Sequence, residues 1–142
     1  MSRDTADELE VSRPALMDAL RGVASAMHTV ACAGLMTDPR DVGRHVGDRD
    51  GGDGVGPDFD PTIFLYDQVA GGVGLAPRMF EERNSLWSRA RELIRDCPCE
   101  HGCPGCIGPV SGEGEEAEPE SAKSLAVRIL ERAPLSPTIT VA

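Results

Sequence analysis

Residues 97–106 read Cys97-Pro98-Cys99-Glu100-His101-Gly102-Cys103-Pro104-Gly105-Cys106 and carry four of the five cysteines of the chain, in the pattern C-x-C-x3-C-x2-C. The glycines and prolines between the cysteines allow tight turns, so that the four sulfurs can be directed toward one point. A tetrahedral shell of four thiolates suits zinc. The pattern therefore predicts a zinc knuckle, meaning residues 97–106, in which Cys97, Cys99, Cys103 and Cys106 bind one structural Zn²⁺ per chain.

The same four cysteines are open to other interpretations. They could be reduced thiols without a metal, form two disulfides, or hold an iron–sulfur cluster, which also accepts four thiolates. His101 could replace Cys99 or Cys103 in a site of three cysteines and one histidine, but five ligands so close in sequence cannot easily reach one ion, which favours the cysteines. Zinc held by four thiolates has no open coordination position, so the expected role of the site is to hold a fold.

The composition bounds the class of protein. A chain of 142 residues with 16 glycines and 11 prolines fits one domain with a modest core. Its formal net charge of -10 argues against independent binding to nucleic acid, because phosphate contacts need clustered Lys and Arg. No stretch resembles a membrane span or an export signal, so we expect a cytoplasmic protein with no membrane partner. Because the cytoplasm is reducing, the clustered cysteines are more suited to metal binding than to disulfides. Cys32, the fifth cysteine, is then not assigned to the metal site.

Apolar residues recur at helical spacing in three parts of the chain. The first helix follows Ser12, whose side chain can cap it, and Pro14 is tolerated in the first turn. The second runs from about Pro77 to Asp96 and leads directly into the knuckle. The third begins at Glu120 and stops at Pro134.

A candidate ligand site lies between a predicted strand and the second helix. The run Thr62–Tyr66 is rich in strand-forming residues and predicts a buried central strand. Asp67 and a turn containing Gly71, Gly72 and Gly74 follow it, and a strand, turn and helix in this order can hold an anion at the helix N-terminus. An enzyme that binds a phosphorylated ligand is therefore an alternative. The spacing matches neither a dinucleotide fingerprint nor a P-loop, which favours a purely structural turn.

Three further side chains are secondary candidates. Asp38 and Asp41 could be catalytic carboxylates, but Asp38 precedes a proline, and such aspartates commonly start turns through side-chain bonds to the backbone. His28 lies beside the apolar stripe of the first helix with no second ligand at helical spacing, so we expect a packed histidine with a hydrogen-bonded ring.

The expected fold class is α/β (α+β), with a small sheet, about three helices and a four-cysteine zinc knuckle. The expected parts are a flexible lead-in at 1–11, a domain at 12–133 and a tail at 134–142 with an edge strand at 138–141. Within the domain we expect a mobile loop rich in glycine and aspartate at 44–60, the knuckle at 97–106 and an acidic linker at 111–119.

Four motifs occur along the chain in a familiar order. They are Asp38-Pro39-Arg40-Asp41-Val42-Gly43, Thr62-Ile63-Phe64-Leu65-Tyr66-Asp67, Gly71-Gly72-Val73-Gly74-Leu75, and the knuckle continued through Ile107-Gly108-Pro109. In this order they resemble the MrfA-like zinc-binding domain at the C-terminus of superfamily 2 (DEAD/DEAH-box) DNA helicases, over roughly residues 13 to 133. Two positions depart from the family pattern, with Ala70 where a proline is expected and Thr37 in place of a cysteine.

The resemblance implies one zinc bound by the four cysteines and a role beside an ATP-dependent helicase engaged in DNA repair or related DNA transactions. The sequence contains no motor motif, so we expect a non-catalytic chain whose partners are helicase motor domains or a motor subunit, with DNA contacted indirectly or through the complex. It could be a separated fragment, a split-gene subunit or a truncated relative. The alternative is a zinc-stabilised protein-interaction module without a nucleic-acid role.

Overall fold

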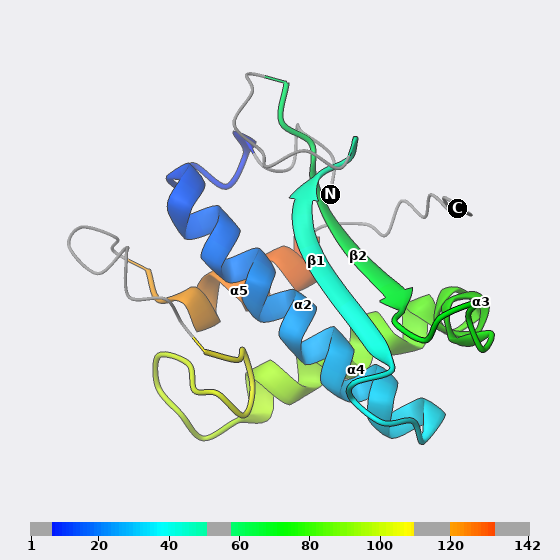
Figure 1. Ribbon diagram of the computed structural model, residues 1–142. Helices are drawn as coiled ribbons and strands as arrows, with labels where there is room; N and C mark the ends of the chain where they lie inside the picture. The colour runs from blue at the N-terminus through cyan, green and yellow to red at the C-terminus, as the bar shows by residue number, and fades with distance from the viewer. Residues whose placement is uncertain (1–6, 51–57, 110–119, 133–142) are drawn as a thin grey trace.

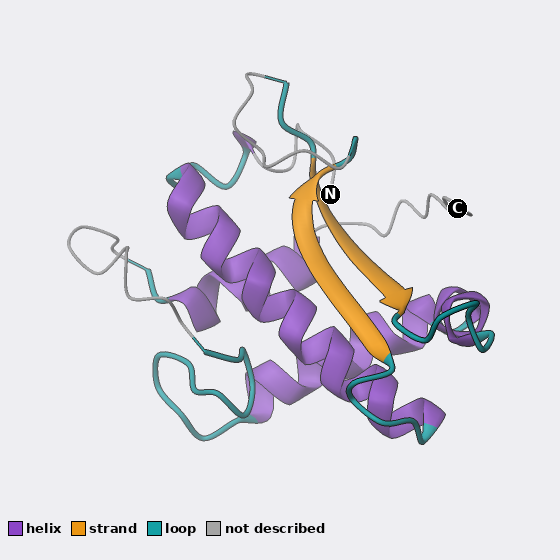
Figure 2. Ribbon diagram, in the orientation of Figure 1, coloured by secondary structure: helices purple, strands orange, loops and turns teal. Residues whose placement is uncertain are grey.

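The computed structural model describes residues 7–50, 58–109 and 120–132 (Figure 1). Its elements are, in chain order, α2 (Arg13–Leu35), β1 (Val42–Asp48), β2 (Pro61–Asp67), α3 (Leu75–Glu81), α4 (Arg83–Asp96) and α5 (Ala122–Arg132). A small sheet beside helices confirms the predicted α+β class (Figure 2). The described part holds four regular helices where about three were expected.

Helix α2 is the centre of the core. Its start is the predicted one: the Ser12 hydroxyl accepts a hydrogen bond from the Ala15 amide at 3.3 Å, and Pro14 lies in the first turn. The predicted apolar stripe is buried, and β1, α4 and α5 all pack on this helix. The buried residues of the stripe include Leu16, Leu20, Val23, Met27 and Val30. The helix ends at Leu35, and the cap residue Met36 that follows it has φ 50° and is 92% exposed.

Strands β1 and β2 form an antiparallel pair in which Gly43 lies opposite Tyr66 and His45 opposite Phe64. The Tyr66 ring lies across Gly43, and a Cβ at that position would collide with the ring. The two strands are the whole sheet in the described part of the chain, and most of β2 is only half-buried. Our prediction of a buried central strand at Thr62–Tyr66 was therefore wrong, because helices cover one face of this ribbon and leave the other to solvent.

The prediction of a loop over residues 44–60 was wrong at its start. Arg44 to Asp48 belong to β1 and pair with β2. Glycine has a low intrinsic preference for strands, so the sequence of β1 did not indicate a strand. The hydrogen-bonded pairing with β2 holds Gly43 and Gly47 in the extended conformation. Residues 51–57 of the predicted loop lie outside the described residues, as do residues 1–6 of the lead-in, the linker at 111–119 and the tail at 134–142.

The predicted helix from Pro77 to Asp96 is two helices, which corrects a further expectation. Glu82 has φ -90° and ψ 6° and separates α3 from α4. Arg83 stabilises the break, since its guanidinium donates to the Phe80 carbonyl at 2.9 Å and lies 4.4 Å from the centre of the Phe80 ring. The guanidinium thus satisfies a carbonyl at the end of α3.

Helix α5 confirms the third predicted helix and buries Leu125, Ala126, Ile129 and Leu130. A hydrogen bond also joins α5 to α4: the Trp87 indole of α4 donates to the Leu130 main-chain carbonyl of α5 at 2.9 Å. In the described residues, no helix is both long enough and apolar enough to span a membrane.

Candidate metal centre

The knuckle follows directly from α4, whose last residue, Asp96, is succeeded by Cys97 in an extended conformation. The Sγ atoms of the four predicted cysteines all lie within 4.8 Å of one another. The closest pairs are Cys97 and Cys103 at 3.6 Å, Cys99 and Cys106 at 3.5 Å, and Cys103 and Cys106 at 3.7 Å. Sulfurs at about 2.3 Å from a tetrahedral zinc ion lie about 3.8 Å apart, so the thiols are spaced as a zinc shell requires.

The thiols are not paired as disulfides, because all five cysteines are free. His101, the possible fifth ligand, has a side chain that is 78% exposed and lies 3.9 Å from the Glu100 carboxylate. Its ring is not among the converging ligand atoms. The structure therefore brings together the four cysteines that the sequence singles out and leaves the histidine at the surface.

Two glycines shape the seat of the knuckle. Gly102 has φ 121°, and a Cβ there would collide with the Ile107 side chain. On the opposite side, a Cβ at Gly22 of α2 would lie 3.0 Å from the Ile107 Cβ. Ile107 is 3% exposed and Cys106 is 2% exposed. Ile107 therefore fills a notch between α2 and the knuckle, and this fixes the cysteine loop against the core.

The thiols of the knuckle differ in acidity. Hydrogen bonds from the Cys97 thiol and from the amides of Gly105 and Cys106 lower the pKa of Cys103 to about 7. Burial raises the pKa of Cys106 to about 12. A cation that binds all four sulfurs must therefore displace the proton of Cys106, while Cys103 is already partly ionised at neutral pH.

Sequence reasoning missed one residue of the site. Lys123 on α5 donates from Nζ to the carbonyl of Cys97 at 2.7 Å and to the carbonyl of Cys99 at 2.5 Å. It lies beyond the acidic stretch and far from the knuckle in sequence. The one available signal was its rarity, since Lys123 is the only lysine among the 14 Lys and Arg residues.

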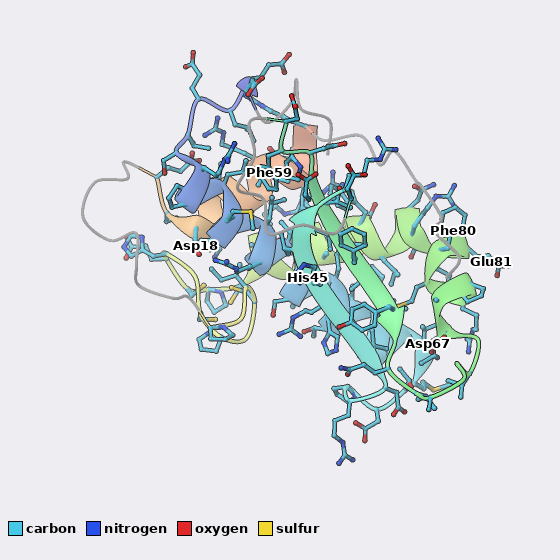
Figure 3. The ribbon with its side chains drawn as sticks, turned by 45° about the horizontal axis from the view of Figure 1, so that its top comes forward. Asp18, His45, Phe59, Asp67, Phe80 and Glu81 are labelled. Atoms are coloured by element: carbon cyan, nitrogen blue, oxygen red, sulfur yellow. The ribbon has the colours of Figure 1, made fainter. Side chains whose placement is uncertain are left out.

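The glycine turn carries a bond within the chain at the position proposed for a ligand. Oδ2 of Asp67 accepts from the Leu75 amide at 3.2 Å and the Ala76 amide at 3.3 Å, and so caps the start of α3 (Figure 3). Gly71, Gly72 and Gly74 have φ values of 83°, 69° and 80°, respectively. The glycines are therefore needed for backbone conformation, and an incoming anion would meet the Asp67 carboxylate. The turn lies at the opposite end of α4 from the knuckle.

His28 confirms the expectation of a hydrogen-bonded ring. Its Nε2 lies 3.0 Å from the carbonyl oxygens of Pro39 and Val42 and 3.7 Å from the Cys32 sulfur. Cys32 is buried in the core, and burial raises its pKa. These two side chains therefore join the end of α2 to β1.

Asp38 forms the predicted turn. Its Oδ1 accepts from the Arg40 amide at 2.9 Å, and its carbonyl accepts from the Asp41 amide at 2.9 Å. A side-chain hydrogen bond from Arg40 lowers the pKa of Asp38 to about 2. Asp41 in turn accepts at its carbonyl from the Gln68 amide at 2.8 Å, just past β2. Both aspartates thus have structural contacts in the connection between α2 and the sheet.

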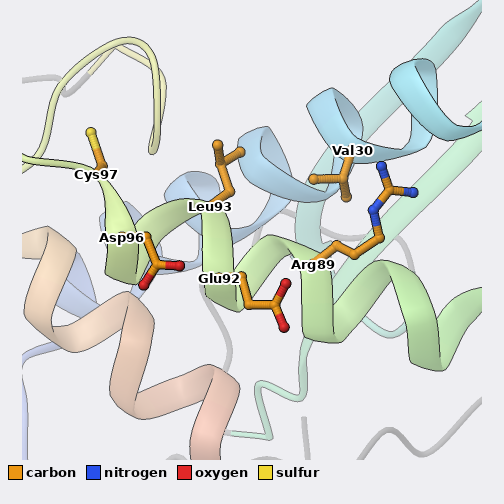
Figure 4. A pocket seen from close by; sticks show the side chains of 6 residues that line it. All are labelled: Val30, Arg89, Glu92, Leu93, Asp96 and Cys97. Atoms are coloured by element: carbon orange, nitrogen blue, oxygen red, sulfur yellow. The ribbon is translucent and has the colours of Figure 1, made fainter.

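An open groove of about 460 Å³ runs between α2 and α4 and reaches the knuckle at Cys97 (Figure 4). Val30 and Leu93 give it an apolar floor, and Arg89, Glu92 and Asp96 give it charges of both signs. Arg89 rests on α2, because a Cβ at Gly34 would lie 2.7 Å from its Nη1 atom. The mixed charge favours no single ligand class.

A small α+β domain in which four thiols converge is typical of a zinc-stabilised domain. Comparison with known families agrees: the chain belongs to the MrfA Zn-binding domain family, whose family model matches residues 23–107. It is thus the zinc-binding domain of a helicase family.

Three relatives match parts of the chain, and two of them are much larger helicases. The uncharacterized ATP-dependent helicase YprA of Bacillus subtilis is 38% identical over 104 residues, which are 73% of this chain and 13% of YprA. The structure of the DUF1998 helicase MrfA bound to DNA aligns with a TM-score of 0.68 and 30% identity, over 86% of this chain and 15% of MrfA. An uncharacterized protein of Methanocaldococcus jannaschii is 42% identical over 46 residues, 32% of this chain and 41% of that protein. The chain thus spans only a small part of the helicases it matches.

Proposed function

We propose that Cys97, Cys99, Cys103 and Cys106 hold one structural Zn²⁺ and that the domain is a non-catalytic module of an ATP-dependent DNA helicase. The observation that carries the first part is the convergence of the four sulfurs within 4.8 Å. Zinc would supply a charge centre that joins the end of α4 to the loop beyond it. With four thiolate ligands no coordination position is left for water or substrate, so the site stabilises structure and does not activate a reactant.

Residues around the four cysteines position the loop that carries them. The Gly102 turn brings Cys103 and Cys106 back toward Cys97, and the buried Ile107 holds this turn on α2. A small aliphatic core gains from such a metal tie, because the free energy of zinc binding is available only to the folded chain. The domain that we propose spans residues 12–133, since Leu125 and Ile129 of α5 are buried in the same core as α2.

The role beside a helicase is supported by the relatives. YprA is described as an ATP-dependent helicase, and the MrfA structure contains DNA. The segment that this chain resembles is 13% of YprA and 15% of MrfA, so most of each helicase lies elsewhere. We propose that this domain completes a motor of that kind and contributes to DNA unwinding or repair through it, with DNA contacted within the complex.

Metal analysis and complementation test the two parts separately. The purified chain is expected to contain about one zinc per chain, and none in a Cys106→Ser variant. YprA from which the matching segment has been deleted is expected to lose ATP-driven unwinding and to regain part of it when this chain is added. The Cys106→Ser chain is the matched control for that addition. Cysteines that react freely and bind no zinc under reducing conditions would overturn the metal assignment.

A second candidate function is a zinc-stabilised protein-interaction module without a nucleic-acid role. The net charge of -10 favours it, because an acidic chain is repelled by phosphate. The two candidates differ in salt dependence: a helicase complex that contains this chain should bind DNA more weakly as salt rises. If the chain leaves the DNA affinity of the truncated helicase unchanged at every salt concentration, the interaction module is the better description.

A further inference from the structure

Lys123 is the only lysine of the chain, and it lies against the knuckle. Its ammonium bonds to two carbonyls, those of Cys97 and Cys99, on either side of Pro98. Its own amide also donates to the His101 carbonyl at 3.4 Å. One residue of α5 therefore contacts three backbone carbonyls of a loop more than 20 residues away along the chain.

The chemistry of the contact suits lysine. An ammonium is a compact charge with three donors arranged tetrahedrally, so it can bond to two carbonyls that converge from different peptides, whereas the guanidinium of arginine is a planar fork. Pro98 has no amide hydrogen, so the short segment between the first two ligands is held from outside through its carbonyls. The Lys123 bonds therefore fix the orientation of the backbone that carries Cys97 and Cys99.

The charge of Lys123 also suits its place. Four thiolates around one Zn²⁺ carry a net charge of about -2. Four covalent bonds separate the carbonyl oxygen of a cysteine from its Sγ, which puts the ammonium within about 7 Å of the Cys97 and Cys99 sulfurs. A cation at that distance is attracted to the zinc-loaded thiolates more strongly than to four neutral thiols.

We propose that Lys123 is a positioning residue of the zinc site, through which zinc binding and the docking of α5 stabilise each other. The inference rests on the proposed four-cysteine zinc site. It adds that the site is completed by a helix outside residues 23–107 and that loss of the metal loosens α5. Such linkage is reciprocal: whatever displaces α5 must also weaken zinc binding.

Variants of Lys123 test the affinity half of this linkage. We expect Lys123→Met to weaken zinc binding by about 10- to 100-fold in competition with a chromophoric chelator, the range found for residues that orient metal ligands. Lys123→Arg should retain part of the affinity, because it keeps the charge but not the geometry. Arg132→Met is the matched control: it removes a cation from the exposed end of α5 and should change zinc affinity by less than about twofold.

A second measurement uses the wild-type chain and does not depend on how a variant folds. Lys123 is the only side-chain amine, so amine acetylation read by mass spectrometry of the peptide that contains it reports this residue alone. We expect acetylation to be slow with zinc and faster after chelation. The emission of Trp87, the only tryptophan, should shift to longer wavelength in the same step, because its indole bonds to Leu130 of α5.

The outcomes separate the two claims. A wild-type chain without zinc would overturn the zinc site itself. A wild-type chain with one zinc, together with an unchanged zinc affinity in Lys123→Met, would leave the zinc site standing and overturn the role of Lys123. Acetylation and Trp87 emission that do not respond to zinc would overturn the linkage to α5.

Discussion

Replacing Ile107 with alanine is expected to destabilise the domain by about 3 to 4 kcal/mol. The side chain is 3% exposed, and the change removes three carbons, worth about 2.4 kcal/mol in transfer free energy at about 0.8 kcal/mol for each. A cavity penalty adds to this loss. Gly22 and Gly102 flank the site and have no side chains that could move into the space, so the cavity should persist.

The measurement is urea unfolding at saturating zinc, followed by Trp87 fluorescence and by circular dichroism. For a chain of this length the loss corresponds to a fall in Tm of about 10 to 15 °C. Ile107→Val is the matched control, since it removes one carbon and should cost about 0.5 to 1.5 kcal/mol. A loss below about 1 kcal/mol for the alanine variant would show that Ile107 does not hold the knuckle on α2.

Three further predictions concern other parts of the structure. Zinc affinity should fall as pH is lowered from about 8 to about 6, and zinc binding should release protons. The reason is that burial raises the pKa of Cys106, so that its thiol stays protonated until the metal displaces the proton. Chelator competition measures the affinity, and proton release is measured in weak buffer. Trp87→Phe should cost about 1 to 3 kcal/mol in urea unfolding, since it leaves the Leu130 carbonyl without its donor. Gly43→Ala should cost about 1 to 3 kcal/mol by the same assay because the added methyl meets the Tyr66 ring, and Tyr66→Ala in the same chain should recover part of the loss.

Short-range patterns predicted the features that depend on neighbours in sequence. The Ser12 cap and the stripe of α2 arise from local hydrogen bonding and helical periodicity, so they could be read before any contact was known. The same holds for α5 and for the cysteine spacing of the knuckle. The four thiols lie within ten consecutive residues, so the local turns of this segment are enough to bring them together.

Features that depend on distant residues were not predictable in this way. The periodicity of residues 77–96 is continuous, but Asp67 binds the first amides of α3, and Arg83 supports a change of direction at Glu82. β1 contains glycines whose order comes from its partner strand. The contact of Lys123 with the knuckle joins residues separated by 24 and 26 positions. No pattern within a short window carries these contacts.

The Tyr66 ring over Gly43 has a consequence for the fidelity of folding. A hairpin whose two strands slip by one residue would bring Tyr66 opposite Val42 or Arg44, where a Cβ stands in the way of the ring. The same slip would turn Ile63 and Leu65 from the helices toward water, because alternate residues of a strand face opposite sides. Gly43 and the exposed Tyr66 ring therefore disfavour a pairing that is shifted by one residue, so this surface contact contributes to the register of the strands as well as covering the finished sheet.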